Sequence, residues 1–150
     1  MFTVTESPHS SASFQLGVLG GEATERFARR IADLGLKPKQ VGVLIALHTG
    51  APASQLELAR RMHVAPSLMV ALADQLEELG AIGRERDAAD RRRQVLTLTD
   101  TGRRLLDVCA GHAAAVDDEL TAGLNVAERR ALRKGLTALA GALGYPVDPQ

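Results

Sequence analysis

Apolar residues recur at three- and four-residue spacing along most of the chain, which is the pattern of amphipathic helices. The first stripe covers residues 14–34 and ends at Gly35, a typical helix-terminating residue. A second helix is expected to begin at Pro38 and to end before Gly50. The polar residues 1–12 show no such period, and we expect them to form a loose arm.

A short helix, a tight turn and a longer helix are expected next. Ser54 and Glu57 have the spacing of a capping box, in which the serine oxygen accepts a backbone N–H and the glutamate accepts the serine N–H. His63 and Val64 are expected to form the turn. The longer helix is expected over about 66–79, with an inward face made of Leu68 or Met69, Leu72, Leu76 and Leu79.

The hydrophobic period shortens to two residues over 81–86 and 94–98, which predicts a β-hairpin with a long polar loop. Thr99 and Asn125 are suited to cap two further helices, and the tail 145–147 is expected to end the second of them. Their apolar stripes are expected at Leu105, Cys109, His112, Val116 and Leu120, and at Leu132, Leu136, Leu139 and Leu143. The predicted fold is therefore mainly α with a small β-hairpin: four helices, the hairpin, and two more helices.

The composition fits one folded domain and narrows its class. Of the 150 residues, 45% are hydrophobic and 24% are charged, which is typical of globular proteins. The single cysteine, Cys109, excludes an internal disulfide framework and fits a reducing compartment. No apolar run approaches the ~20 residues that cross a bilayer, and the first residues lack the order of a signal peptide. We therefore expect a cytoplasmic protein without membrane contact.

The positions of the charges are more informative than their sum. Lysine plus arginine number 18, as do aspartate plus glutamate, so the net charge is zero. However, five arginines gather in the hairpin, whereas the acids of the preceding helix lie toward its C-terminal half. This layout places attractive charge where phosphates would approach. Together with the two helices before it, the basic hairpin predicts a winged helix-turn-helix, with the longer helix in a major groove and the hairpin at a minor groove.

Residues 90–102, Asp-Arg-Arg-Arg-Gln-Val-Leu-Thr-Leu-Thr-Asp-Thr-Gly, resemble the wing signature of MarR-type transcriptional regulators, an Asp-x-Arg followed by Leu-Thr-x-x-Gly. Residues 34–40, the Leu-Ala pair at 58–59 and residues 76–82 also resemble that family. The similarity spans about residues 14–143. It implies a homodimeric regulator, expected here to be a repressor, that binds a palindromic operator in duplex DNA and is relieved by a small ligand or by oxidation.

The resemblance also implies roles for regions and residues. Within a single domain, residues 14–35 and 100–145 would form the dimerisation region and residues 36–99 the DNA-binding region. Asp90 would orient the wing through hydrogen bonds, and Arg92 would reach the minor groove. DNA contacts are expected at Ser54, Gln55, Pro66, Ser67, Leu68, Val70, Ala71, Arg84, Arg86, Asp90, Arg91, Arg92 and Arg93. Dimer contacts are expected at Phe14, Leu16, Leu19, Leu120, Leu124, Leu132, Leu136, Leu139, Leu143 and Tyr145. A ligand pocket between the first, second and fifth helices is expected at Phe27, Leu44, His48, Cys109 and His112.

The longer helix departs from the family pattern where it would face DNA. The family has a run of hydroxyls and then a basic residue, but residues 67–73 read Ser-Leu-Met-Val-Ala-Leu-Ala. Base reading would then rely on Ser67, Gln75 and backbone amides, with thymine-methyl contacts from Leu68 or Val70. Otherwise discrimination is weak, or the apolar face docks a protein. The alternative function is therefore a winged-helix protein that binds a partner protein, or an architectural protein that binds DNA without sequence discrimination.

Other candidate sites are weaker. Cys109 and His112 lie one turn apart, so a thiol-based oxidation sensor is a second alternative, although a buried cysteine is the simpler interpretation. Glycines 17, 20 and 21 fit either a frayed first turn or close contact with another backbone. The histidines and the cysteine have no metal-ligand spacing, and no motif indicates an enzyme or a cofactor.

Overall fold

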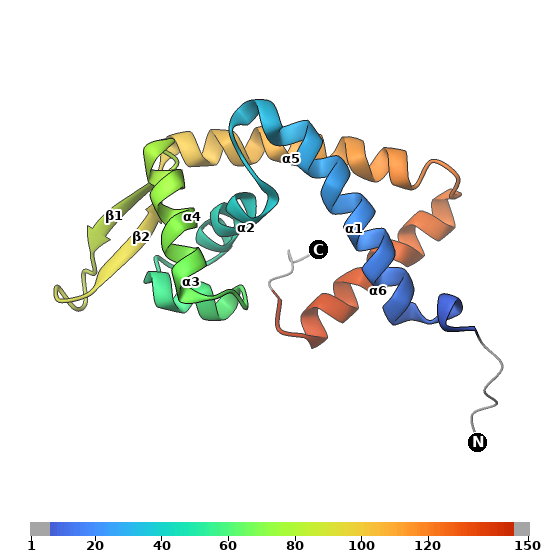
Figure 1. The fold of residues 1–150 in the computed structure, drawn as a ribbon, viewed down its shortest axis with the longest axis horizontal. Helices are drawn as coiled ribbons and strands as arrows, with labels where there is room; N and C mark the ends of the chain where they lie inside the picture. Colours follow the sequence, from blue (N-terminus) through green and yellow to red (C-terminus); the bar gives the residue numbers. More distant parts are fainter. Residues whose placement is uncertain (1–6, 146–150) are drawn as a thin grey trace, which may run out of the picture.

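The computed structural model describes residues 7–145 and confirms the predicted fold, six helices with one β-hairpin (Figure 1). The helices are α1 (Ala12–Ile31), α2 (Pro38–Thr49), α3 (Gln55–Arg61), α4 (Pro66–Glu78), α5 (Asp100–Leu120) and α6 (Val126–Ala142). Strands β1 (Ile82–Arg86) and β2 (Gln94–Leu98) form one antiparallel hairpin, in which Arg84 pairs with Leu96. Two short 3-10 helices, η1 (Pro8–Ser10) and η2 (Ala32–Leu34), flank α1.

The expectation of a loose arm is wrong for residues 8–12. The 3-10 helix η1 occupies most of this stretch, and α1 begins directly after Ser11, whose hydroxyl oxygen accepts a helix N–H. A capped helix start satisfies backbone donors that a loose arm would leave to water. Residues 1–6 of the predicted arm and residues 146–147 of the predicted tail lie outside the described residues.

The glycines near the start of α1 lie within the helix. Because α1 runs unbroken through Gly17, Gly20 and Gly21, the interpretation as a frayed first turn is wrong. No atom from elsewhere in the described structure lies within 4 Å of the place where a Cβ would stand at any of the three. Within the described residues, no other part of the protomer packs against α1 at these glycines, and contact with another backbone stays a prediction.

Side-chain caps fix several helix starts as predicted. At α3, Ser54 Oγ accepts the Glu57 N–H at 3.3 Å, and Glu57 Oε2 accepts the Ser54 N–H at 2.8 Å. Asn125 caps α6 in the same reciprocal manner, and Thr99 caps α5. His63 lies in the turn between α3 and α4 with a φ of +52°, a backbone region that histidine tolerates. Local polar chemistry therefore defines where these helices begin.

The hydrophobic core lies between α2, α3, α4 and the hairpin. Leu44 of α2, Leu58 of α3 and Leu96 of β2 are fully buried in it, together with Met69 and Leu76 of α4. The middle of helix α5 joins this core through the buried side chain of Cys109, which belongs to the predicted stripe. Spacing of three and four residues therefore identified the buried positions Met69, Leu72 and Leu76 of α4 and Cys109 and Val116 of α5.

One expected core position differs from the prediction. Leu79 was expected to face inward, but it is 39% exposed, because α4 ends one residue earlier and Leu79 is its C-cap. Within the predicted stripe of α5, Cys109 and Val116 are buried, whereas Leu120, also predicted as a dimer contact, is exposed at the last residue of the helix.

Helix α5 spans the length of the molecule and joins the hairpin to the end where α1 and α6 lie (Figure 1). Thr99, just before α5, donates its N–H to Ala81 O at 3.1 Å and its hydroxyl to Gly80 O at 2.6 Å. In the first turn of α5, a Cβ at Gly102 would overlap the Ala81 carbonyl oxygen and stand 2.6 Å from Leu98 Cδ1. Only glycine allows α5 to start this close to the hairpin.

Within residues 7–145, no helix combines the length and apolar character needed to span a membrane. The same residues hold no group of three or more His, Cys, Asp or Glu side chains placed to bind a metal ion.

Candidate nucleic-acid interface

The N-terminal half of α4 exposes four of the predicted contact residues: Pro66, Ser67, Val70 and Ala71. Their spacing places them on neighbouring rows of one helix face, and Leu68 beside them is partly buried. Ser67 supplies the single hydroxyl of this face. Gln75, further along α4, accepts a hydrogen bond from Gln40 Nε2 at 2.8 Å, so its carbonyl oxygen is already engaged. This face offers mainly methyl groups to a ligand.

The start of α3 holds two more predicted contacts, Ser54 and Gln55, both partly buried. The Ser54 oxygen accepts a hydrogen bond as the helix cap, and its hydroxyl proton can still be donated outward. Just before it, Ala53 O accepts the Leu96 N–H at 2.8 Å. This backbone bond places strand β2 beside the start of α3.

Arg84 was predicted to contact DNA, but its side chain is held by α4. Arg84 Nη2 lies 2.5 Å from Asp74 Oδ1, and its Nη1 pairs with Glu77. In this structure two carboxylates neutralise Arg84, so it contributes little free positive charge, and its contact with DNA stays a prediction. Asp74 and Glu77 are three residues apart on one helix face, and that spacing was the signal the sequence offered.

Arg93 is also engaged within the protomer, and its predicted contact with DNA stays untested. Its guanidinium pairs with Glu57 of the α3 capping box and lies 3.6 Å from Asp87 Oδ2. The Ser54 N–H hydrogen bond, and then the charge of Arg93, hold the pKa of the Glu57 carboxyl below its ordinary 4.5. Glu57 and Arg93 are 36 residues apart, so no local spacing could have revealed the pair.

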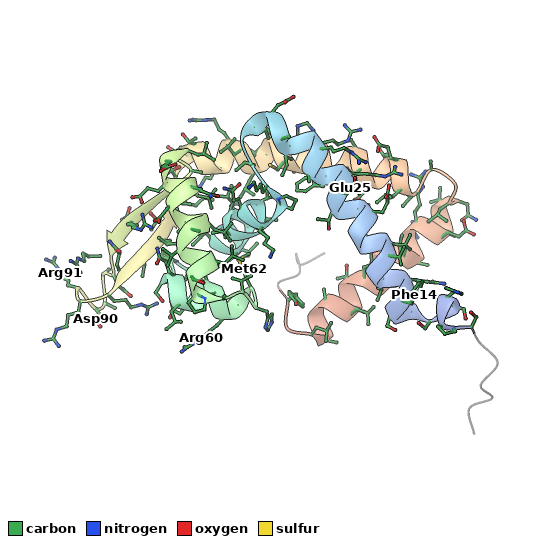
Figure 2. The ribbon with its side chains drawn as sticks, in the orientation of Figure 1. Phe14, Glu25, Arg60, Met62, Asp90 and Arg91 are labelled. Atoms are coloured by element: carbon green, nitrogen blue, oxygen red, sulfur yellow. The ribbon has the colours of Figure 1, made fainter. Side chains whose placement is uncertain are left out.

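The remaining hairpin arginines, Arg86, Arg91 and Arg92, have no carboxylate within ion-pair distance in the described part of the chain. Asp90 Oδ1 accepts the Arg92 N–H at 3.0 Å, and Asp90 O accepts the Arg93 N–H at 2.9 Å. These bonds are the kind of orienting contact that the family resemblance implies for Asp90. Figure 2 shows Asp90 and Arg91 at the outer end of the hairpin, away from the helices.

A cleft of about 690 Å³ lies between α1, α2 and α5. Three predicted pocket residues, Phe27, His48 and Cys109, line it. Leu44 does not, because it is fully buried in the core, and His112 lies outside the lining. The α5 side of the cleft follows a row next to the predicted stripe, which explains why His112 is excluded.

Sequence reasoning missed two charged residues of this cleft, Arg103 and Asp107 of α5. Together with residues 106, 110 and 113 they repeat at three- and four-residue spacing, and this was the available signal. Arg103 Nη1 donates to Leu98 O at 3.2 Å and lies 3.3 Å from Asp100 Oδ1. The cleft therefore combines apolar walls with a cation and an anion on one side.

Cys109 is 2% exposed, and burial raises the pKa of its thiol above the ordinary 9.0. The thiolate is the reactive form of cysteine, and a raised pKa makes it scarcer at neutral pH. Both observations disfavour an oxidation sensor and fit a small buried side chain.

Comparison with known proteins identifies the family. Residues 34–93 match the model described as MarR family. A protein of Thauera aromatica, assigned as the transcriptional regulatory protein for the hcr operon, is 34% identical over 134 residues, which cover 86% of this chain and 81% of the relative. The chain belongs to the MarR family. The family membership predicted from the motif at residues 90–102 is thus confirmed.

Solved structures agree with this family along nearly the whole chain. The transcriptional repressor CouR bound to a 23-mer DNA duplex is 30% identical, with a TM-score of 0.74 over 91% of this chain and 99% of that one. CouR from Rhodococcus jostii RHA1 bound to p-coumaroyl-CoA is 26% identical, with a TM-score of 0.74 over 97% and 100%. The MarR-family chain is a DNA-binding transcriptional regulator with a winged helix-turn-helix, and not an enzyme.

The MarR-family chain leaves a large apolar surface uncovered at the end where α1 and α6 lie. Every residue predicted to form a dimer contact is exposed, with 36–69% of its surface accessible: Phe14, Leu16, Leu19, Leu120, Leu124, Leu132, Leu136, Leu139, Leu143 and Tyr145. No residue of α6 is buried. Exposed large apolar side chains in this number favour a surface that another molecule covers, although Tyr145 also lies against His63 of the α3–α4 turn.

Proposed function

We propose that this regulator binds a palindromic operator as a homodimer, with α4 in the major groove and the wing at the minor groove. One observation carries the proposal: the exposed start of α4 and the wing tip lie at the same edge of the molecule (Figure 1), and three wing arginines have no carboxylate partner among residues 7–145. A guanidinium suits the negative potential of a narrow minor groove. In this proposal Arg86, Arg91 and Arg92 contact DNA, whereas Arg84 and Arg93 stay with their intramolecular partners.

The uncovered apolar surface of α1 and α6 supports the homodimer. An exposed leucine stripe gains free energy when a second copy covers it, and a two-fold axis lets the same patch serve both partners. The two wings would then meet half-sites about 10 base pairs apart, or a multiple of that distance. Sedimentation equilibrium tests the assembly, and a monomer at micromolar concentration would contradict it.

The cleft between α1, α2 and α5 is the proposed effector site. Its lining supports a small, partly apolar compound with an anionic group, since Arg103 lies beside apolar walls and Phe27. A structural relative, CouR, is described bound to p-coumaroyl-CoA, and CouR is also described as a repressor. We infer that this chain represses transcription in the cytoplasm and that a bound effector relieves the repression.

A second candidate function follows from the apolar face of α4. With Val70 and Ala71 exposed and one hydroxyl nearby, this face has few groups that distinguish base pairs, so binding without sequence discrimination or docking to a protein is the alternative.

Selection of binding sites from random duplexes separates the two functions. An enriched palindrome supports the regulator. Bound duplexes with no common sequence support the architectural alternative, and the absence of duplex binding supports docking to a protein.

A further inference from the structure

The loop between the two strands of the wing, residues 87–93, is closed at its base by Arg93. Asp87 donates its N–H to Arg93 O at 2.9 Å, and Arg93 donates its own N–H to Asp90 O at 2.9 Å. The exposed Arg91 and Arg92 lie in the loop between these bonds, and Figure 2 shows Arg91 at the outer end of the wing. The backbone of Arg93 thus holds the shape of the loop that carries the two exposed arginines.

The side chain of Arg93 joins the same loop to α3. Its guanidinium pairs with Glu57 and lies 3.6 Å from Asp87. Glu57 is itself immobilised, because its carboxylate accepts the Ser54 N–H at 2.8 Å as part of the capping box. The carboxylate that receives Arg93 is therefore a fixed point on the helix-turn-helix rather than a mobile surface group.

Two attachments now connect the wing to the start of α3. The first is the backbone bond from Leu96 N–H to Ala53 O, at 2.8 Å. The second is the Arg93–Glu57 pair, three residues further along the hairpin toward its tip. The base of the hairpin is held further by the pairs of Arg84 with Asp74 and Glu77 of α4. The Arg93–Glu57 pair is the attachment nearest the tip, so it restrains the loop that the other attachments leave free to bend.

We infer that Arg93 is a positioning residue for DNA binding, which acts through Glu57 to hold the wing tip at the angle where Arg91 and Arg92 meet the duplex. The inference rests on the proposed function. It assigns different tasks to adjacent arginines: Arg92 contacts DNA, and Arg93 orients the loop that carries it. A binding surface held in its productive geometry loses less entropy on association, so releasing the tip weakens binding without removing a contact.

Charge alone predicts a different result, and this makes the inference testable. Arg93→Gln removes a positive charge from the wing, whereas Glu57→Gln removes a negative charge from α3 beside it and keeps a side chain able to cap α3. If these residues acted only through their charge near phosphate, the first variant would weaken binding and the second would strengthen it. If Arg93 acts through Glu57, both variants weaken binding.

The experiment measures affinity for the duplex selected from a random library, at several salt concentrations, for the full-length protein. We expect Arg93→Gln and Glu57→Gln each to lower affinity about tenfold, and the double variant to be no weaker than either single variant. The matched control is Arg92→Gln, which should reduce the slope of log affinity against log salt by about 1 per protomer, whereas Glu57→Gln should not reduce it. Additive losses in the double variant, or tighter binding by Glu57→Gln, would overturn the inference.

A second readout is independent of DNA. Amide hydrogen exchange of residues 87–93 in the free protein should accelerate in Arg93→Gln and in Glu57→Gln, but not in Arg92→Gln. Unchanged exchange in the first two variants would refute the positioning role while leaving the proposed function intact. Wild-type protein that binds no duplex at all would refute the proposed function, and this inference with it.

Discussion

The two ends of the molecule differ in how they bury apolar surface. The winged helix-turn-helix encloses a core of its own, in which Leu44, Leu58 and Leu76 are fully buried. At the other end α6 has no buried residue, and its leucine stripe faces solvent. Because apolar side chains stabilise a fold only when they are covered, the first end is stable within one chain, whereas the second gains stability when another molecule covers it. In the homodimer that we propose, that molecule is a second copy of the chain, and folding of this end would be coupled to assembly.

The largest expected effect comes from placing a charge in the leucine stripe of α6. We expect Leu136→Glu to convert the dimer into monomers, because covering the stripe would bury an unpaired carboxylate. Loss of paired half-sites should then lower operator affinity by roughly 100-fold or more. Sedimentation equilibrium and DNA titration measure the two effects.

A control variant on the same helix sharpens this test. Lys134 lies away from the leucine stripe in the helical period, so Lys134→Glu adds negative charge without entering the proposed interface. It should stay dimeric. If Leu136→Glu remained dimeric as well, the difference between the two ends of the molecule would have another explanation.

The second prediction concerns the enclosed core. We expect Leu76→Ala to lower the free energy of unfolding by about 2–5 kcal/mol, since it removes a fully buried side chain and leaves a cavity. The decrease in melting temperature caused by Leu76→Ala should be similar at low and high protein concentration. The loss caused by Leu136→Ala should instead shrink as protein concentration rises, because mass action restores the dimer. If the melting temperatures of both variants depended equally on protein concentration, the two ends of the molecule would not differ in the proposed way.

The third prediction concerns the wing tip. We expect Arg92→Ala to weaken operator binding by about 1–3 kcal/mol per protomer, because it removes a guanidinium that reaches the groove. The melting temperature should not change, since Arg92 is exposed and has no carboxylate partner in the described part of the chain. Titration against a labelled operator measures the effect, and unchanged affinity would remove Arg92 from the interface.

Lowering the pH is expected to have a smaller effect on stability, through one carboxyl group at each end of the molecule. Glu119 on α5 pairs with Arg30 and lies 3.5 Å from Arg26, both on α1. The hydrogen bond from Arg30 lowers the pKa of Glu119 below its ordinary 4.5. The pKa of Glu57, at the other end of the molecule, is also below 4.5. A carboxyl whose pKa is lowered by folding stabilises the fold at any pH above its ordinary, unfolded-state pKa. This contribution is lost as the pH falls through the lower pKa of the folded state.

Glu119→Gln and Glu57→Gln should therefore each flatten the decline of melting temperature between about pH 6 and pH 3. Calorimetry across that range measures the slopes. A decline in both variants as steep as in the wild type would show that neither carboxyl contributes.

The smallest effect is expected at Cys109. Its buried thiol with a raised pKa should react slowly with a thiol reagent in the folded protein, and peroxide should leave operator binding unchanged. Rapid labelling of the folded dimer would revive the sensor hypothesis. Cys109→Ala serves as the control for reaction at other sites.

Short-range features of the fold could be predicted from the sequence, and long-range ones could not. The capping boxes at Ser54 and Asn125 follow from residues three positions apart, and both form. The pairing of Arg84 and Arg93 with carboxylates depends on how the hairpin packs against α4 and α3, and the spacing of Asp74 and Glu77 on α4 alone does not show which arginine they meet. Consequently the wing was predicted correctly as an element, but the intramolecular ion pairs of two of its five arginines were not predicted.

The tight contact at Gly102 links the wing to α5 without slack. No methyl group fits between the first turn of α5 and the end of the hairpin, so any larger residue at position 102 would push the helix and the hairpin apart. The same contact means that α5 cannot shift toward the hairpin without displacing it. In the proposed function, an effector bound against α5 would therefore reach the base of the wing through this contact, without touching a residue that meets DNA.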